Sequence, residues 1–437
     1  MNISKTRRSG GRRVLAYLLT AAMVIALLPA ITPTARAAGM TYVSSTGNHY
    51  TVTEEVIGNR AITVADNNQV LELGAGDSIT SVTGRVPNIT LIFKGYSSND
   101  RLASNAINGY DNLTIYIVDG TENELLYGTW MQGTDSWLFE GGPLGTGKLT
   151  VTGQSQAGGI AGAGPDRTID IAGGTIIANG ASGGAGIGGD NNQPGGNIII
   201  RGNAKVTATG TSGGAGIGAG NYGTSADITI KDHAFVIASG GSSDGSGVGA
   251  GYVSTSSLTT GTANITISDN SVVYAQGGSS GAAAIGTGYN NTGNKTANVN
   301  VTIGTGADNP TVVAYAGGTK ASRYPVAIGI AGNDAALGHA DIQIKSGTVI
   351  AETRGAGVPD IGIPADMTSA TASVTITGGS VYAVHDRIAP APENSYALAL
   401  TVLNPPAFVT DVGGNGLGGA TVSADVNVGV ANPYTYN

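Results

Sequence analysis

Gly214-Ala215-Gly216-Ile217-Gly218 decides the fold, because the stretch recurs along the chain in near-identical form. A polar loop follows it, and then come the alternating run Ile228-Thr229-Ile230 and a turn at Lys231-Asp232-His233. A second β-prone run, Phe235-Val236-Ile237-Ala238, leads to a turn at Gly240-Gly241. Alternation of apolar and polar residues predicts strands with one buried face. One unit of about 30 residues therefore holds three short strands and three turns.

The glycine-rich phrase recurs at least seven times, at intervals of 27 to 43 residues. Its copies centre on Ile160, Ile187, Ile217, Val248, Ile285, Ile328 and Ile361. A repeat of this length is typically one supersecondary unit, which buries its apolar face only by stacking on its neighbours. The sequence therefore predicts an all-β fold, a right-handed parallel β-helix solenoid with three short strands per coil.

The chain divides into four predicted segments. Residues 1–37 combine a basic start, an apolar run and the cleavage pattern Ala35-Arg36-Ala37, which predicts a signal peptide and a secreted or cell-surface protein. A retained membrane anchor is the alternative. Residues 38–155 are predicted as an N-terminal cap and irregular first coils, and 156–389 as regular β-helix repeats. Residues 390–437, which are rich in proline, are expected to form a C-terminal cap or the start of a truncated next module.

Charge and composition narrow the function classes. Without residues 1–37 the chain keeps 15 Lys and Arg against 29 Asp and Glu, which disfavours nucleic acid and anionic membranes as partners. It has no cysteine, so disulfides and thiolate metal sites are excluded. No cofactor is expected. Calcium is left open, although the calcium-binding nonapeptide G-G-x-G-x-D is absent: Gly183-Gly184-Ala185-Gly186 continues with Ile187-Gly188.

The glycine strand bears on catalysis. If Ala185 and Ile187 point inward, alternation turns Gly184, Gly186 and Gly188 outward, and that face of the rod is nearly bare of side chains. Proton transfer needs acids and bases on the surface that meets the substrate. Catalysis on this face is therefore disfavoured. This holds whether the glycines keep the face bare of side chains or only allow tight corners between strands.

The loop after each glycine strand varies most in length, and variable loops on one side of a solenoid often form its binding surface. Tyr222, Tyr252 and Tyr289 follow their glycine strands in three consecutive coils, so stacked rings beside amides and carboxylates are expected to suit sugar rings. The alternative is ordinary turn chemistry. The candidate ligand-binding residues of these loops are Asp190, Asn191, Asn221, Tyr222, Tyr252, Tyr289, Asn290, Asn333 and Asp334.

The outward face of the third strand offers a second candidate surface. Alternation predicts one outward row there, consisting of Ile177, Thr207, Ile237, Tyr274, Ile350 and Tyr382. An exposed apolar row of this length usually packs against something: a partner domain, another subunit or a polysaccharide. Tyr274 and Tyr382 are therefore added to the candidate ligand-binding residues.

The repeats resemble those of secreted parallel β-helix proteins of Gram-positive bacteria, within the broad pectate-lyase-like superfamily. The phrases that carry the resemblance are Gly184-Ala185-Gly186-Ile187-Gly188 and Ile376-Thr377-Gly378-Gly379-Ser380-Val381-Tyr382-Ala383, and it covers about residues 85–385. It implies the β-helix fold, export and carbohydrate binding. The catalytic Asp and Arg/Lys constellation of the lyases has no match here, so the resemblance carries over no catalytic residue.

Three functions are weighed. The first is a non-catalytic extracellular β-helix that binds a polysaccharide of cell-wall or plant type. The second is a structural adhesin or stalk module with further domains or self-association. The third is a polysaccharide lyase or glycoside hydrolase whose acids come from the loops, such as Asp190, Asp334 and Asp366. No nucleic acid, and no membrane after signal cleavage, is expected as a partner.

Overall fold

The computed structural model describes residues 39–434, except 64–67, 84–87, 99–111, 133, 255–259, 292–294, 319–322, 354–357, 385–387, 390–397 and 401–431. The predicted signal peptide, residues 1–37, lies outside the described residues, as does most of segment 390–437. The described residues form strands and turns without a helix, so none of them forms a helix that could cross a membrane.

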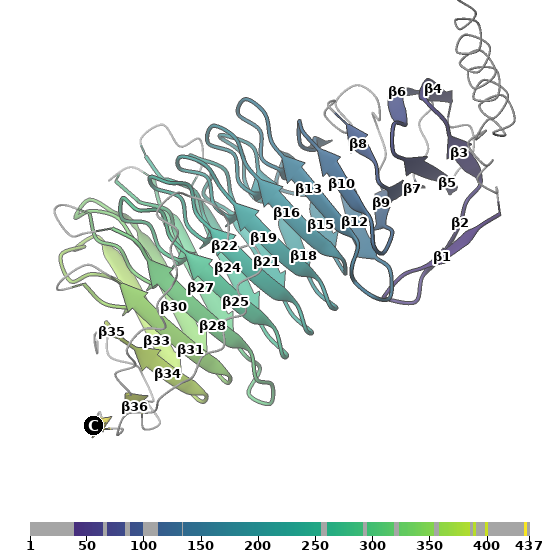
Figure 1. Ribbon diagram of the computed structural model, residues 1–437. Helices are drawn as coiled ribbons and strands as arrows, with labels where there is room; N and C mark the ends of the chain where they lie inside the picture. Colours follow the sequence, from purple (N-terminus) through teal and green to yellow (C-terminus); the bar gives the residue numbers. More distant parts are fainter. Residues whose placement is uncertain are drawn as a thin grey trace, which may run out of the picture.

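Three long parallel sheets run along a rod, and each coil of the regular repeat contributes one strand to each sheet (Figure 1). The first coils contribute strands to fewer sheets. This confirms the predicted parallel β-helix. The twelve-stranded sheet contains β3 (Glu54–Val56), β5 (Gln69–Gly74), β7 (Asn88–Lys94), β9 (Asn112–Ile117), β12 (Ser136–Gly141), β15 (Thr168–Ile171), β18 (Asn197–Ile200), β21 (Ala226–Ile230), β24 (Gly261–Ile267), β27 (Ala297–Ile303), β30 (Gly338–Ile344) and β33 (Ala370–Ile376).

The other two long sheets take the second and third strand of each coil. The ten-stranded sheet contains β8 (Ser97–Ser98), β10 (Glu122–Leu125), β13 (Lys148–Thr152), β16 (Thr175–Asn179), β19 (Lys205–Thr209), β22 (Phe235–Ser239), β25 (Val272–Gln276), β28 (Thr311–Ala316), β31 (Thr348–Thr353) and β34 (Ser380–Ala383). The nine-stranded sheet contains β11 (Met131–Gln132), β14 (Ile160–Ala163), β17 (Ile187–Gly189), β20 (Ile217–Gly218), β23 (Val248–Gly249), β26 (Ile285–Gly286), β29 (Ile328–Gly329), β32 (Ile361–Gly362) and β35 (Ile388–Ala389).

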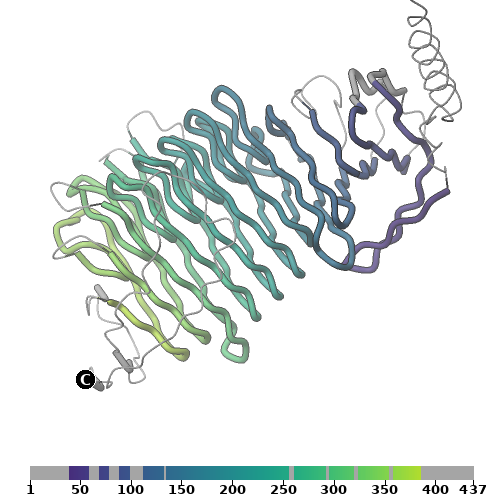
Figure 2. The backbone as a smooth tube through the Cα atoms, in the orientation of Figure 1, coloured from purple at the N-terminus to yellow at the C-terminus, as the bar shows by residue number. Residues whose placement is uncertain are grey.

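The remaining strands pair in twos outside these sheets, and the first pair, within residues 41–51, lies near the N-terminal end of the rod (Figure 2). Near the N-terminal end, β1 (Thr41–Val43) and β2 (His49–Thr51) form an antiparallel hairpin, and β4 (Asn59–Thr63) pairs in parallel with β6 (Ser78–Thr83). Within segment 390–437, β36 (Leu398–Leu400) pairs antiparallel with β37 (Asn432–Tyr434). The segment's role as a cap or as a further module stays a prediction.

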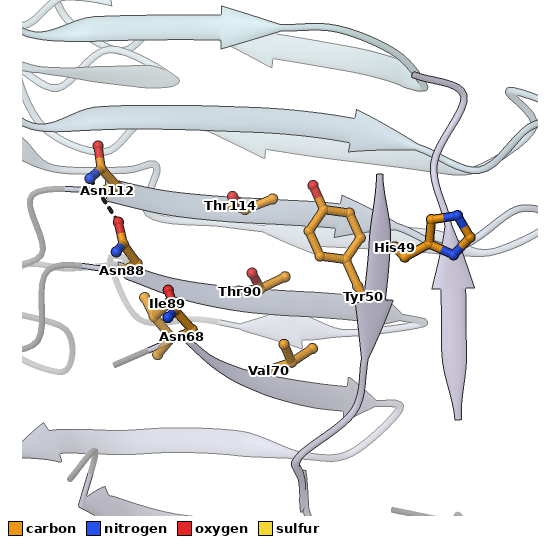
Figure 3. A pocket seen from close by; sticks show the side chains of 9 residues that line it. All are labelled: His49, Tyr50, Asn68, Val70, Asn88, Ile89, Thr90, Asn112 and Thr114. Carbon is orange, nitrogen blue, oxygen red and sulfur yellow. Dashed lines mark hydrogen bonds between the residues drawn. The ribbon is translucent and has the colours of Figure 1, made fainter. Parts of the chain in front are cut away.

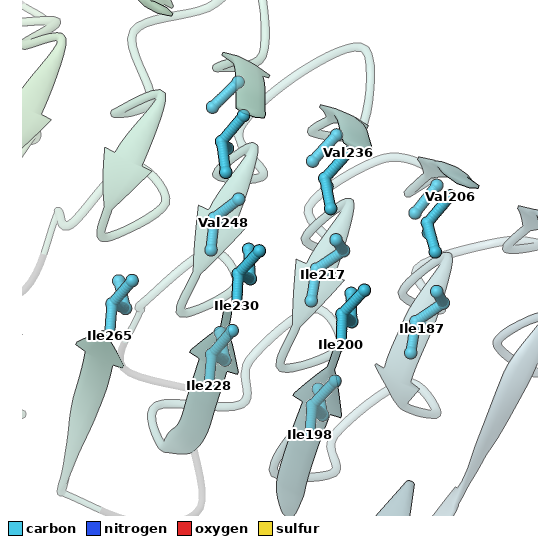
Figure 4. Close-up of a cluster of buried hydrophobic side chains, with 14 of the residues drawn as sticks. Ile187, Ile198, Ile200, Val206, Ile217, Ile228, Ile230, Val236, Val248 and Ile265 are labelled. Carbon is cyan, nitrogen blue, oxygen red and sulfur yellow. The ribbon is translucent and has the colours of Figure 1, made fainter. Parts of the chain in front are cut away.

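The core consists of apolar side chains stacked in register from coil to coil. Ile198 pairs with Ile228, and Ile228 pairs with Ile265, because equivalent strands meet without a register shift. Figure 4 shows the same stacking for Ile187, Ile217 and Val248 of the nine-stranded sheet and for Val206 and Val236 of the ten-stranded sheet. Each of these side chains is fully or almost fully buried. The period-2 pattern thus fills one continuous interior along the rod.

The glycine strands do not form a bare outer face, and that prediction is wrong. Gly184, Gly186 and Gly188 are all buried. The backbone packs so closely that a Cβ added at Gly218, where φ is +136°, would lie 1.9 Å from the carbonyl oxygen of Gly249 in the next coil. An L side chain fits neither that conformation nor that space. Glycine is needed there for close contact between backbones.

The β1–β2 hairpin lies on the outer face of the twelve-stranded sheet at its N-terminal end (Figure 1). Tyr42 and Tyr50 pack on Tyr116, with ring centroids 5.5 and 5.6 Å from that of Tyr116. The Tyr42 hydroxyl donates to the buried carboxylate of Glu72 at 2.6 Å, and the Tyr50 hydroxyl donates to that of Glu140. The hairpin therefore covers the first strands of this sheet.

Candidate functional site

The loops after the glycine strands carry polar side chains that bond to one another from coil to coil. The Asn221 amide donates to the Asn191 carbonyl oxygen at 3.1 Å, and the Asn191 amide donates to that of Gln156 at 3.2 Å. The backbone N–H of Asn221 also donates to the carbonyl oxygen of Gly183 at 2.7 Å. The amide ladder therefore ties neighbouring coils together at the edge of the rod.

The three loop tyrosines pack together, as their spacing predicts. The ring centroids of Tyr222 and Tyr252 are 5.5 Å apart with the planes tilted by 48°. Those of Tyr252 and Tyr289 are 6.1 Å apart and nearly parallel, at 3°. The Arg323 guanidinium lies 4.4 Å from the centroid of Tyr289, in a cation–π contact. Tyr289 is only 6% exposed. The ring faces of Tyr252 and Tyr289 are thus largely occupied by protein groups.

Burial shapes the ionisation of this stack. It raises the pKa of the Tyr252 hydroxyl and that of Tyr289, so both stay protonated at neutral pH. Burial also raises the pKa of Asp244, although the ion pair with Arg323 acts in the opposite direction. The Tyr252 hydroxyl accepts a hydrogen bond from the Asn291 amide at 2.6 Å. Contacts among these side chains therefore connect three neighbouring coils.

Of four further loop candidates, three form hydrogen bonds with backbone groups and one is exposed at the surface. Asp190 accepts from the backbone N–H of Gly158 at 2.8 Å. Asn290 is fully buried, and its amide donates to a backbone carbonyl at 3.0 Å. The Asn333 side chain accepts from a backbone N–H two residues further on, and Asp334 is exposed. The structure thus brings the tyrosines together, and it places Asp334 near them: burial raises the pKa of Tyr289, and the charge of Asp334 adds to that rise.

Tyr274 and Tyr382 lie on the other candidate surface, the outer face of the ten-stranded sheet. The strand register places the whole predicted row in one line along the rod: Ile177, Thr207, Ile237, Tyr274, Ile350 and Tyr382. Val313 also belongs to the row, between Tyr274 and Ile350, although it is only 7% exposed. At roughly 4.8 Å per coil, the row is about 29 Å long. Sheet geometry therefore presents a straight, narrow apolar strip.

Phe235 and Val272 extend this strip sideways and were missed in the sequence analysis. Phe235 stands two residues before Ile237 in β22, on the same face, and is 39% exposed. Its ring centroid lies 5.7 Å from that of Tyr274. The alternation of inward and outward residues that identified the row also places residues two positions earlier on the outer face. The sequence pattern could therefore have identified Phe235 and Val272. Val313 was missed because its coil carries an insertion around Asn309-Pro310.

Polar side chains flank the strip on both sides. One flanking line contains Lys148, Thr175, Lys205, Thr311, Thr348 and Ser380. The other contains Thr152, Asn179, Thr209, Ser239 and Gln276. The face therefore combines aromatic and aliphatic surface with hydroxyl and amide groups, in the same register as the strip.

Among the acidic candidates for catalysis, Asp190 lies far from the other two. Asp190 follows β17, Asp334 follows β29 and Asp366 follows β32, so the first two are four coils, or about 19 Å, apart along the rod. Glycosidase carboxylate pairs are separated by about 5 to 10 Å. Among the described residues no group of three or more His, Asp or Glu side chains could hold a metal ion. Distance therefore excludes a carboxylate pair that contains Asp190, whereas Asp334 and Asp366 belong to consecutive coils.

Comparisons with known proteins return no match: no protein-family model, no curated protein and no solved structure matches this chain.

Proposed function

We propose that the chain is a secreted or cell-surface β-helix protein that binds polysaccharide without cleaving it, on the outer face of its ten-stranded sheet. The observation that carries the proposal is the strip around Phe235 and Tyr274, in which a ring pair lies among aliphatic side chains and polar flanks. Sugar rings have apolar C–H faces and hydroxyl edges. Aromatic side chains suit the faces, and hydroxyl or amide groups suit the edges.

The shape of this face favours an extended ligand. The strip is straight because equivalent residues repeat at each coil, so a linear polymer can contact several coils at once. Contacts at successive coils are linked through one ligand chain, so weak individual contacts add up. The acidic composition and the leader-like start of the sequence fit a protein outside the cell.

The test is co-sedimentation of residues 38–437 with a panel of insoluble polysaccharides, with release of reducing ends measured in the same tubes. Depletion without release is expected. The double change Phe235→Thr and Tyr274→Thr, which introduces a residue already present in both rows, is expected to weaken binding about tenfold or more.

A loop change provides the matched control. Tyr222 has a φ of +65°, and Asn192, at the same place one coil earlier, has a φ of +64°. Tyr222→Asn therefore removes a ring without straining the backbone. Retention that survives the sheet variant but is lost on Tyr222→Asn would move the site to the loops. No depletion across the panel would favour the structural stalk, and release of reducing ends would reveal an enzyme.

A further inference from the structure

A pocket lies where the β1–β2 hairpin meets the outer face of the twelve-stranded sheet, on a different sheet from the strip and nearer the N-terminal end of the rod. Its volume is about 320 Å³. Figure 3 shows His49 and Tyr50 on the hairpin side, a group of asparagines on the opposite side, and Thr90 and Thr114 between them. The lining residues are His49, Tyr50, Asn68, Val70, Asn88, Ile89, Thr90, Asn112 and Thr114.

Strand register builds the floor of this pocket. Val70 pairs with Thr90, and Thr90 pairs with Thr114, so one residue from each of three coils lies in line. Asn88 pairs with Asn112 in the neighbouring line, and the Asn112 amide donates to the Asn88 carbonyl oxygen at 2.8 Å. The floor is therefore an ordered array of hydroxyl and amide groups.

Hydrogen bonds and ring packing fix the position of the hairpin wall on the sheet. The Tyr50 hydroxyl and the Thr46 hydroxyl both donate to the buried carboxylate of Glu140, and the Asn48 amide donates to it at 3.0 Å. The Tyr50 ring also packs on Tyr116. A wall that is already ordered loses little conformational entropy when a ligand binds.

The Asn-x-Thr pattern of the pocket floor occurs again on the twelve-stranded sheet, away from the hairpin that forms the pocket wall. In β24 and β27 the pairs Asn264/Thr266 and Asn300/Thr302 repeat the Asn-x-Thr pattern in register, and the Asn300 amide donates to the Asn264 carbonyl oxygen at 2.8 Å. That stretch lies beyond the hairpin, on open sheet (Figure 1). The hairpin is thus what converts an Asn–Thr face into a concave site.

The chemistry of the lining specifies a ligand class. Among the described residues, the lining holds amides, hydroxyls, one phenol ring and one imidazole beside Val70 and Ile89, and it holds no Asp, Glu, Lys or Arg. Such groups pair with hydroxyl-bearing, uncharged ligands, and the ring offers an apolar face. The volume is at the small end of the range for ligand pockets. We propose that this pocket binds one or two neutral sugar rings, as a second saccharide site that can exist whether or not the ten-stranded sheet binds polysaccharide.

The test is saturation-transfer difference NMR on residues 38–437 with cellobiose, chitobiose, xylobiose and mannobiose, and with digalacturonate as an acidic comparator. At least one neutral disaccharide is expected to receive transfer. Thr90→Val with Thr114→Val keeps the side-chain shape and removes two hydroxyls, so the affinity is expected to fall about tenfold.

Thr266→Val with Thr302→Val is the control, because it makes the same change on the same sheet outside the pocket, and it is expected to leave the signal intact. The proposal is overturned if no neutral disaccharide receives transfer, if only digalacturonate does, or if the Thr90/Thr114 variant binds like the control. Phe235→Thr with Tyr274→Thr tells the two sites apart, since it is expected to reduce sedimentation with polysaccharide and to leave disaccharide binding unchanged.

Discussion

At the residue scale, the glycines of the nine-stranded sheet set how closely the coils approach. Gly188, Gly218 and Gly249 all have φ between +130° and +136°. A Cβ added at Gly218 would lie 1.9 Å from the next carbonyl oxygen. Glycine at these positions therefore reflects a steric requirement as well as a conformational one.

Gly218→Ala is expected to destabilise the protein by about 2–4 kcal/mol, since it combines backbone strain with a clash that the next coil must relieve. Gly76→Ala separates the two effects, because Gly76 has a φ of +81° and open space around its added Cβ. It should cost only about 1 kcal/mol. Thermal unfolding of both variants measures this, and equal losses would contradict the role given to close packing.

At the element scale, the hairpin is attached to the rod by a few hydrogen bonds to buried carboxylates. Glu140 is fully buried and accepts from Thr46, Asn48 and Tyr50, all of which belong to the hairpin segment. The apolar contribution comes from the packing of Tyr42, Tyr50 and Val52 on the sheet. An element held in this way can open locally while the coils stay folded.

Glu140→Ala is expected to loosen the hairpin by about 1.5–3 kcal/mol, because the half-buried Tyr50 hydroxyl loses its buried, charged acceptor, whereas the exposed Thr46 and Asn48 can turn to water. Faster amide hydrogen exchange at residues 39–52, with the exchange of β18 to β27 unchanged, is the expected result. Glu122→Ala is the control, since the Glu122 side chain is 83% exposed and its 3.9 Å ion pair with Lys148 contributes little. Uniform acceleration along the rod would contradict a local role.

At the scale of the whole molecule, the rod is a stack of coils that contact mainly their neighbours. Ile187 pairs with Ile217 and Ile217 with Val248, so equivalent positions recur at fixed points of the coil. Interactions that span more than two coils are exceptional, and the ion pair of Arg323 with Asp244 is one of them. A solenoid of this kind tolerates a change in the number of its coils.

Deletion of residues 188–217 removes one whole coil and joins Ile187 to Gly218 in register. The variant is expected to fold, with a rod shorter by roughly 4.8 Å and a modest loss of stability. Deletion of residues 188–202 removes half a coil, so later strands meet the wrong sheet and the β structure should collapse. Circular dichroism and small-angle scattering distinguish the two. Equal tolerance of both deletions would contradict a stack of register-matched coils.

The sequence by itself determined the architecture of the rod. Alternation at Ile228-Thr229-Ile230 and its equivalents marks buried strand faces, and a period near 30 residues forces stacking, because one unit cannot bury its own apolar face. The same alternation identified the row of Tyr274 and Tyr382. These features are local and repeated, so they can be read without knowing which distant residues meet.

Only the tertiary structure decided which of the predicted surfaces are buried, covered by other side chains or part of a pocket. It showed that Gly184 and its equivalents are buried, that Arg323 covers the face of Tyr289, and that Thr90 and Thr114 line a pocket beside the hairpin. Each of these depends on contacts between segments far apart in the chain or on the folding-back of loops of variable length. Periodicity predicts which face of a strand points outward, but the packing of other segments decides whether that face meets solvent.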